Sequence, residues 1–332
     1  MEWILWALNE GFFMALMKIG QGIVGRQSPT LWHIILATGI TGAVMMIVGF
    51  LIVIRQRKPV YVPDGYLMGS LASGLVMFGA TFCAFAALRA GADMGANTFV
   101  GNALVILPTT FIGRWSFSER VGVRQWMGVA LGLAGAVCVT VPALGKGGEH
   151  VWIAWSLGTL AFATLMRVIP KQIAKWGDAR ALPPLHPGQM LFWGGASMML
   201  CMLLGFAGGE DVRRDVLAPT LIGIIIAVGL CNVVWWWSRL RAFQARAPIA
   251  IKDLPSLPIY LATASVAGTL FFGDEMGVIK VIGLLMFLPA FFLAEEQAWP
   301  HCTRFLVRYR WWNWLLRFAG KPTPPVSVRA GF

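Results

Sequence analysis

Charged residues are scarce in this sequence: Asp, Glu, Lys and Arg make up 13% of its 332 residues, about half their share in a typical soluble domain. Hydrophobic residues account for 58%, and the mean hydropathy is +0.70. With so little charge, a water-soluble fold could not cover its surface. The composition therefore excludes a cytosolic enzyme, a disordered chain and a secreted disulfide scaffold, and it predicts a polytopic membrane protein.

Sequence motifs for catalysis or metal binding are also missing. The four histidines are dispersed, the five cysteines form no CxxC pair, and neither HExxH nor a Gly-rich phosphate loop occurs. The basic residues behind the net charge of +12 are scattered over membrane-flanking loops and form no soluble basic domain. We therefore expect no enzyme activity, no metal site, no cofactor and no nucleic-acid partner.

Ten apolar stretches are long enough to cross a membrane as helices, which need about 20 residues each. None of them alternates in the manner of a barrel strand. The sequence therefore predicts an all-α bundle of ten transmembrane helices, over residues 3–24, 31–54, 66–88, 92–113, 122–143, 151–169, 188–208, 217–238, 247–272 and 277–294.

The distribution of basic residues favours one orientation of these helices. With the amino terminus in the cytoplasm, nineteen Lys and Arg residues lie on the cytoplasmic side and six on the other, in agreement with the positive-inside rule. Arg167 and Arg239 are counted among the nineteen. We expect a multi-pass protein of a bacterial-type inner membrane, with both termini in the cytoplasm.

An internal repeat divides the chain into two halves. An ungapped shift of 155 positions places Phe117 on Phe272 and Glu119 on Asp274, and the hydropathy of the two segments agrees. Because five spans are an odd number, the second copy enters the membrane from the opposite side, which gives an inverted-topology repeat. The sequence thus predicts two five-helix repeats, over residues 1–145 and 150–294.

Short motifs in both halves resemble the drug/metabolite transporter superfamily, in particular its EamA-type members. Each half carries an acidic turn, Ser118-Glu119-Arg120 or Gly273-Asp274-Glu275, and a Gly-rich span follows the first turn at 128–137. The opening WALNEGFFMALMKIG at 6–20 is also similar to the start of family members. The resemblance implies a ten-span secondary transporter of a small polar or amphipathic metabolite, working by alternating access, with export as the commoner direction.

Polar residues inside the spans are candidates for the transport site, because a charge at bilayer depth must be buried and paired. Glu10, Met14 and Lys18 share one face of the first helix. Glu10 could bind a proton or a cationic group, with Met14 as an adaptable wall. The alternative is that Glu10 and Lys18 reach opposite membrane surfaces.

A second group of candidates lies in the fourth and ninth spans. The shift of 155 places Asn97 on Lys252, so both halves have a polar side chain at equivalent positions. Lys252 and Asp253 are adjacent in a segment with Pro255, and we expect them on different faces of a helix and not simply paired with each other. The alternative is a loop position for Lys252 near the cytoplasmic surface.

Three further residues complete the predicted substrate site. Asn102 and Asn232 could bond the solute, although intramembrane amides more often join helices. Trp235 begins a run of three tryptophans; an interfacial aromatic belt is the commoner interpretation, but one ring could wall the site. At the membrane edges we predict gating or structural-turn roles for Glu119, Arg120, Asp274 and Glu275.

The segment 295–332 differs in character from the spans. It predicts a basic amphipathic helix followed by a Pro-rich tail, suited to contact anionic lipid headgroups of the cytoplasmic leaflet. It could also dock a protein partner. This leaves two alternatives to solute transport: a non-transporting membrane subunit that docks partners through this tail, and a flippase of lipid-linked substrates on the same fold.

Overall fold

The chain folds into a bundle of helices, seen here in a computed structural model that describes residues 2–28, 30–144, 151–203, 219–249, 252–253 and 255–294. No strand occurs in these ranges. The helices are α1 (Glu2–Gln27), α2 (Leu31–Arg55), α3 (Asp64–Arg89), α4 (Met94–Thr98), the π-helix η1 (Phe99–Ala103), α5 (Ile106–Ser116), α6 (Val123–Leu144), α7 (Val151–Ala179), α8 (Pro187–Leu200), α10 (Pro219–Gln244), α11 (Leu257–Phe272) and α12 (Val278–Ala294).

Many of these helices suit a membrane. Five helical runs are long and apolar enough to cross one, namely α2, α3, the run from α4 to α5, α7 and α10; α11 and parts of α6 and α12 are shorter and apolar. Helix α1 is 26 residues long but carries four charged residues. The prediction of an all-helical membrane protein is confirmed, and each of the ten predicted stretches contains a helix. The predicted helix and tail of 295–332 lie outside the described residues.

The fourth predicted span is interrupted in its middle. Leu104 N donates to Phe99 O at 3.2 Å, a wide turn of the π type, and Leu107 N then donates to Leu104 O at 3.0 Å. Pro108 explains the interruption, because it has no N–H to offer the Leu104 carbonyl. Such turns commonly occur at functional positions in helices. Here it redirects the segment that carries Asn102.

The ninth predicted span, 247–272, is helical only from Leu257 onward. Pro255 and Pro258 account for this late start, since proline disfavours helix in the residue before it and is tolerated in the first turn. Before the helix, Ser256 N and Leu257 N both donate to Asp253 O at 3.0 Å. Lys252 and Asp253 therefore lie in a turn and not on a helix.

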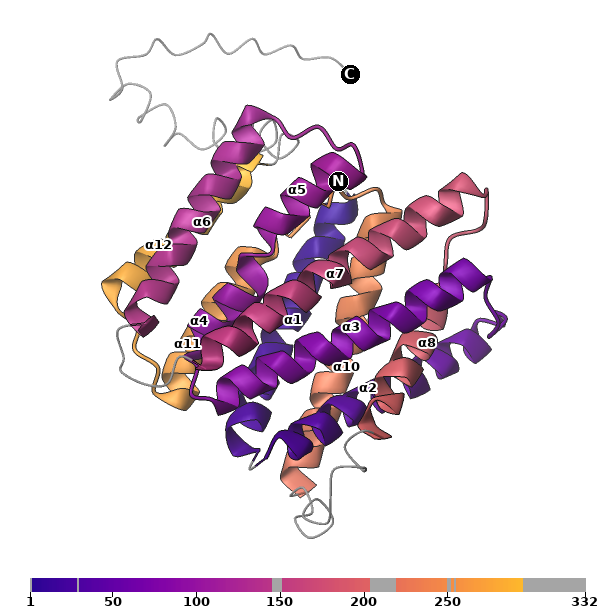
Figure 1. Cartoon of the computed structure of the whole chain (residues 1–332), viewed down its shortest axis with the longest axis horizontal. Helices are drawn as coiled ribbons and strands as arrows, with labels where there is room; N and C mark the ends of the chain where they lie inside the picture. Colours follow the sequence, from indigo (N-terminus) through magenta and orange to yellow (C-terminus); the bar gives the residue numbers. More distant parts are fainter. Residues whose placement is uncertain are drawn as a thin grey trace, which may run out of the picture.

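The helices associate in pairs that join distant parts of the chain. The most extensive contacts are α6 with α12, α2 with α8, α3 with α7 and α1 with α10. Figure 1 shows α6 and α12 together on one side of the molecule and α2 with α8 on the other, with α1, α3 and α7 between them. Buried residues of these central helices form the main core.

Glycine permits the close approach of α6 and α12. A Cβ atom on Gly135 would lie 2.6 Å from the Gly283 carbonyl oxygen, whereas one on Gly132 would meet its nearest neighbour at 3.7 Å. Small residues let membrane helices approach to backbone contact, where dispersion forces are strongest. Gly135 is therefore required for this pairing, and Gly132 is not.

Candidate functional site

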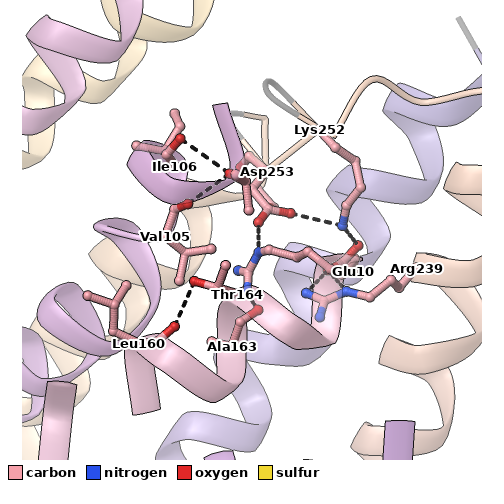
Figure 2. Close-up of polar contacts among 12 residues, drawn as sticks. Glu10, Val105, Ile106, Leu160, Ala163, Thr164, Arg239, Lys252 and Asp253 are labelled. Atoms are coloured by element: carbon pink, nitrogen blue, oxygen red, sulfur yellow. Dashed lines mark hydrogen bonds and ion pairs between the residues drawn. The ribbon is translucent and has the colours of Figure 1, made fainter. Parts of the chain in front are cut away.

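Five ionisable side chains form one continuous cluster at the centre of the bundle. Glu10 Oε1 accepts hydrogen bonds from Arg239 Nε at 2.8 Å and Nη2 at 2.5 Å. Glu10 Oε2 accepts from Lys252 Nζ, which lies 2.9 Å from Asp253 Oδ1. Asp253 Oδ2 accepts from Arg167 Nε. Figure 2 shows Lys252 between the two carboxylates. We call these five residues the central ion cluster.

Burial makes this arrangement necessary. Arg239 is fully buried, Glu10 and Lys252 are 1% exposed, Arg167 2% and Asp253 8%. An ion in such surroundings costs several kcal/mol unless an opposite charge and hydrogen bonds compensate it. Each carboxylate here contacts two cations, and each terminal cation contacts one carboxylate. The cluster holds three cations and two anions, so one positive charge is in excess.

Helix α1 and the turn before α11 meet closely at the cluster. A Cβ atom on Gly11 would lie 2.8 Å from Ser256 Cβ. A glycine next to Glu10 therefore lets the turn reach α1, which brings Lys252 to the Glu10 carboxylate. Nearby, Asn9 Nδ2 donates to Ser238 Oγ at 2.6 Å and fixes α1 against α10.

Aromatic rings cover the cationic end of the cluster. The Arg239 guanidinium lies 4.0 Å from the ring centroid of Trp235 and 5.8 Å from that of Trp236. Both rings are buried, and Trp236 Nε1 donates to Met77 Sδ. The interpretation as an interfacial belt is therefore wrong for these two tryptophans, because α10 turns their face toward α1 and α3.

A small central cavity, with about 20 Å³ open to water, lies beside the cluster. Helices α1, α3, α7 and α10 and the π-helix supply its walls. They contribute Met14, Met17, Lys18, Gln21, Met77, Ala80, Thr81, Ala84, Asn102, Thr159, Ala163, Met166, Asn232 and Trp235. The cavity is thus lined by apolar side chains with a few polar groups, the usual composition of a small-molecule site.

Two further cavities share lining residues in series with the central one. One, of about 10 Å³, shares Met77 with the central cavity and is also lined by Trp236 and Leu240. The other, of about 150 Å³, shares Leu240 with the second cavity and is also lined by Tyr66 and Arg246. Trp236 contacts Met77, the residue that lines both the central cavity and the second one. Together they form a row from the centre toward the end of α10.

The structure brings most of the predicted site residues together. Glu10, Lys252 and Asp253 are in the central ion cluster, while Met14, Asn102, Asn232 and Trp235 line the central cavity. Glu10 is paired inside the bundle and Lys18 is 3% exposed, so neither reaches a membrane surface. The expected helical placement of Lys252 and Asp253 is wrong, because they lie in a turn. They contact each other there, but they are not simply a pair, since Lys252 also contacts Glu10.

Asn97 does not line the cavity. Its Oδ1 accepts from Ser156 Oγ at 2.8 Å, and its Nδ2 donates to Ala84 O at 3.4 Å. The side chain therefore joins α4 to α7 and α3, which is the commoner role of a buried amide between membrane helices.

Sequence reasoning missed Arg167 and Arg239, which it counted as cytoplasmic loop residues. Both are buried: Arg167 lies inside the predicted span 151–169, and Arg239 lies just past the predicted end of a span, where α10 continues to Gln244. A signal was present in each case: Arg167 lies within the apolar run TLMRVIP, and Arg239 follows the aromatic run. An arginine in such a run suggests a buried counter-ion elsewhere in the bundle.

The second acidic turn contacts the first half of the chain. Asp274 Oδ1 lies 2.9 Å from Arg26 Nη2, and Asp274 Oδ2 accepts from Met94 N at 2.8 Å. Arg26 also donates to Phe272 O at 3.1 Å, with its guanidinium 4.5 Å from the Phe272 ring centroid. We call Asp274, Arg26 and Met94 the Asp274 bridge.

The first acidic turn makes the corresponding contacts with the second half. Glu119 Oε1 accepts from Ile249 N at 3.0 Å and lies 3.2 Å from Lys171 Nζ. Lys171 Nζ is 6.0 Å from the ring centroid of Phe117 and donates to Ala247 O at 2.9 Å. We call Glu119, Lys171 and Ile249 the Glu119 bridge.

The remaining residues of the two turns are more exposed. Arg120 and Glu275 are both exposed. Lys280 Nζ lies 2.8 Å from Asp93 Oδ2 and donates to the Glu275 carbonyl at 3.0 Å.

Comparison with known proteins identifies a similar fold. No family model matches the sequence. No curated protein matches it either. A solved structure described only as "Crystal structure of protein" has 16% sequence identity to this chain and a TM-score of 0.63. The match covers 87% of this chain and 97% of the other. This similarity shows that another protein adopts the same helical arrangement over most of its length.

Proposed function

We propose that the protein is a ten-span secondary transporter that moves a small polar or amphipathic metabolite across a bacterial-type inner membrane by alternating access. Its two inverted repeats would be the five spans from α1 to α6, with α4, η1 and α5 as one span, and the five from α7 to α12. Export is the direction that the resemblance to EamA-type transporters favours. Both termini would lie in the cytoplasm.

The pairing of helices supports this duplication. Exchange of the two halves relates α1 to α7, α2 to α8, α3 to α10 and α6 to α12. The pairs α2–α8 and α6–α12 each consist of two equivalent helices, so the exchange leaves them unchanged. The pair α1–α10 is converted into the pair α7–α3. These four pairs have the most extensive contacts in the bundle, which is the pattern expected from a pseudo-twofold axis.

The two bridges support the same relationship at the level of single hydrogen bonds. The shift of 155 positions that relates Glu119 to Asp274 also relates Met94 to Ile249, the two residues whose backbone N–H groups bind these carboxylates. Arg26 and Lys171 supply the equivalent cations, each close to the aromatic ring that precedes the acidic residue.

The bridges are well placed to close the two ends of a transport path. Met94 begins the run from α4 to α5 and Glu119 follows its end. The run spans 23 residues, which as a straight α-helix would extend about 34 Å, close to the thickness of a bilayer core. The central ion cluster and the central cavity lie between them. This pair of equivalent bridges at opposite ends of one run is the observation that carries the proposal.

The remaining basic residues agree with the orientation. Without the buried Arg167 and Arg239, seventeen of the original nineteen stay on the proposed cytoplasmic side, against six opposite. The row of cavities ends near Arg246 on that same side.

Labelling of a cavity cysteine would test alternating access without knowledge of the solute. Thr81→Cys places a thiol in the central cavity of a variant whose native cysteines are replaced. We expect Asp274→Asn to increase its reaction with a membrane-impermeant maleimide from the side of the Asp274 bridge, and Glu119→Gln to increase the reaction from the opposite side.

Asp64→Asn, at an exposed carboxylate of α3, serves as the control and should change neither rate. The proposal is contradicted if both bridge variants increase labelling from the same side, or if neither does.

A further inference from the structure

Polar atoms without partners are concentrated in the central cavity. Asn102 Nδ2, both amide atoms of Asn232, Gln21 Oε1 and Trp235 Nε1 are buried and have no hydrogen-bond partner among the described residues. Lys18 also lines the cavity and makes neither a hydrogen bond nor an ion pair within the described part of the chain. Since a buried polar group left unpaired costs about 1–3 kcal/mol, five such side chains in one cavity indicate a place for a ligand.

The charge around the cavity is positive. The central ion cluster has one cation in excess, and Lys18 adds a second formal charge with no carboxylate beside it. Arg239 Nη1, on the guanidinium that stacks on the cavity residue Trp235, also has no partner in the described structure. Both carboxylates of the cluster are occupied by cations. The cavity can therefore compensate an anion but not a cation.

The rest of the cavity wall is apolar and deformable. Met14, Met17, Met77 and Met166 line it together with the face of Trp235. Thioether side chains adapt to differently shaped apolar groups and pack well against aromatic rings. In this state the cavity has about 20 Å³ open to water, room for about one or two water molecules, so the methionine side chains must move apart to admit a small ligand.

We propose that the central cavity binds a small organic monoanion, a carboxylate attached to an apolar or aromatic body. Lys18 Nζ is the counter-ion of the carboxylate, the amide groups of Asn102 and Asn232 bond its oxygens, and the body packs among the methionines. The inference rests on the proposed transport function, since it names the class of solute. Binding is measured independently of transport, so failure of one is distinguishable from failure of the other.

Three probes of similar shape and different charge test the inference. Phenylacetate, phenylacetamide and phenethylamine are titrated by calorimetry into the full chain in lipid nanodiscs. We expect phenylacetate to bind at least about tenfold more tightly than the neutral amide, a difference of about 1.4 kcal/mol, and phenethylamine to bind least.

Variants at position 18 identify the source of this preference. Lys18→Met should bring phenylacetate down to the affinity of the amide, whereas Lys18→Arg should keep the preference and Lys58→Met, at an exposed lysine, should change nothing. Thermal unfolding of Lys18→Met should be unchanged or shifted upward, because an uncompensated buried cation is removed.

If phenethylamine binds as tightly as phenylacetate, if Lys18→Met keeps full phenylacetate affinity, or if no probe binds, the inference is overturned. The cysteine-labelling experiment on the two bridges would then still decide whether the protein alternates between two open states.

Discussion

Arg239 gives both its Nε and its Nη2 hydrogens to a single oxygen of Glu10 and leaves the other oxygen to Lys252. The contact joins α10 to α1, and its two residues are 229 positions apart in the sequence. A carboxylate shared in this way is the counter-ion of two cations that the bundle has removed from water. Glu10 is therefore a structural counter-ion at the centre of the proposed transport path.

Substitution of Glu10 should be strongly destabilising. Glu10→Gln leaves Arg239 and Lys252 without a full counter-charge, and breaking a buried ion pair costs about 3–5 kcal/mol. Glu10→Gln combined with Arg239→Met should recover part of the loss. Thermal unfolding in detergent measures both, with Asp64→Asn as an exposed control. Wild-type stability in Glu10→Gln would show that the cluster does not need this charge.

The pairing of α6 with α12 should depend on one glycine far more than on its neighbour. Gly135→Ala places a methyl group 2.6 Å from the Gly283 carbonyl oxygen, whereas Gly132→Ala meets its nearest atom at 3.7 Å. Overpacking of this kind typically costs about 1–3 kcal/mol. We expect a lower unfolding temperature for the first variant and little change for the second. Equal effects would mean that the helices do not approach at Gly135.

The interpretation of Asn97 as a helix-joining residue can be separated from a role in binding. Ser156→Ala removes the donor to Asn97 Oδ1 and should cost about 0.6–1.7 kcal/mol, the range measured for hydrogen bonds between membrane helices. Phenylacetate affinity should stay the same. A selective loss of affinity without loss of stability would assign Asn97 to the ligand site instead.

Stability should fall in mild acid because of His186. The side chain caps α8, with Gly188 N donating to its Nδ1 at 3.1 Å. Burial lowers the pKa of His186, and the charges of Arg241 and Lys58 lower it further. The folded state thus holds the proton less tightly than the unfolded state, so the stabilisation is present above the unfolded pKa, about 6.5, and is lost as pH falls through the folded value.

An N-cap contributes about 1 kcal/mol, which sets the expected size of this effect. Thermal unfolding of the wild type at pH 7.5 and pH 5.5 measures it, and His186→Asn, which can cap without titrating in this range, should reduce the difference. A difference of the same size in that variant would place the sensitive group elsewhere.

Hydropathy was sufficient to predict the helices but not how the spans end. The apolar runs marked a helix in every predicted stretch, because a membrane span must satisfy its backbone internally and be apolar outside. At two places prolines prevented an apolar run from forming one continuous α-helix. Pro108 diverted the fourth stretch into a π-helical turn, and Pro255 with Pro258 delayed α11 until Leu257. The prolines can be read from the sequence. Their effect on the helix cannot, because it depends on which carbonyl groups lose a hydrogen-bond donor.

The candidate site was predictable in its residue types and incompletely in its partners. Intramembrane Glu10 and Lys252 indicated an interior site because their charges have to be compensated. Arg167 and Arg239 escaped notice, since an arginine at the end of an apolar run looks the same whether the helix stops there or continues. Which helices face each other is a tertiary property that one sequence does not reveal, and the counter-ions depended on it.

The alternation of signs along the central ion cluster has an arithmetic consequence. Neutralising any one of its three cations brings the total to zero, whereas neutralising either acid doubles the surplus. The five positions should therefore differ in their tolerance to mutation. Among random substitutions at these positions, the variants that still fold should occur mostly at Arg167, Arg239 and Lys252, and rarely at Glu10 and Asp253.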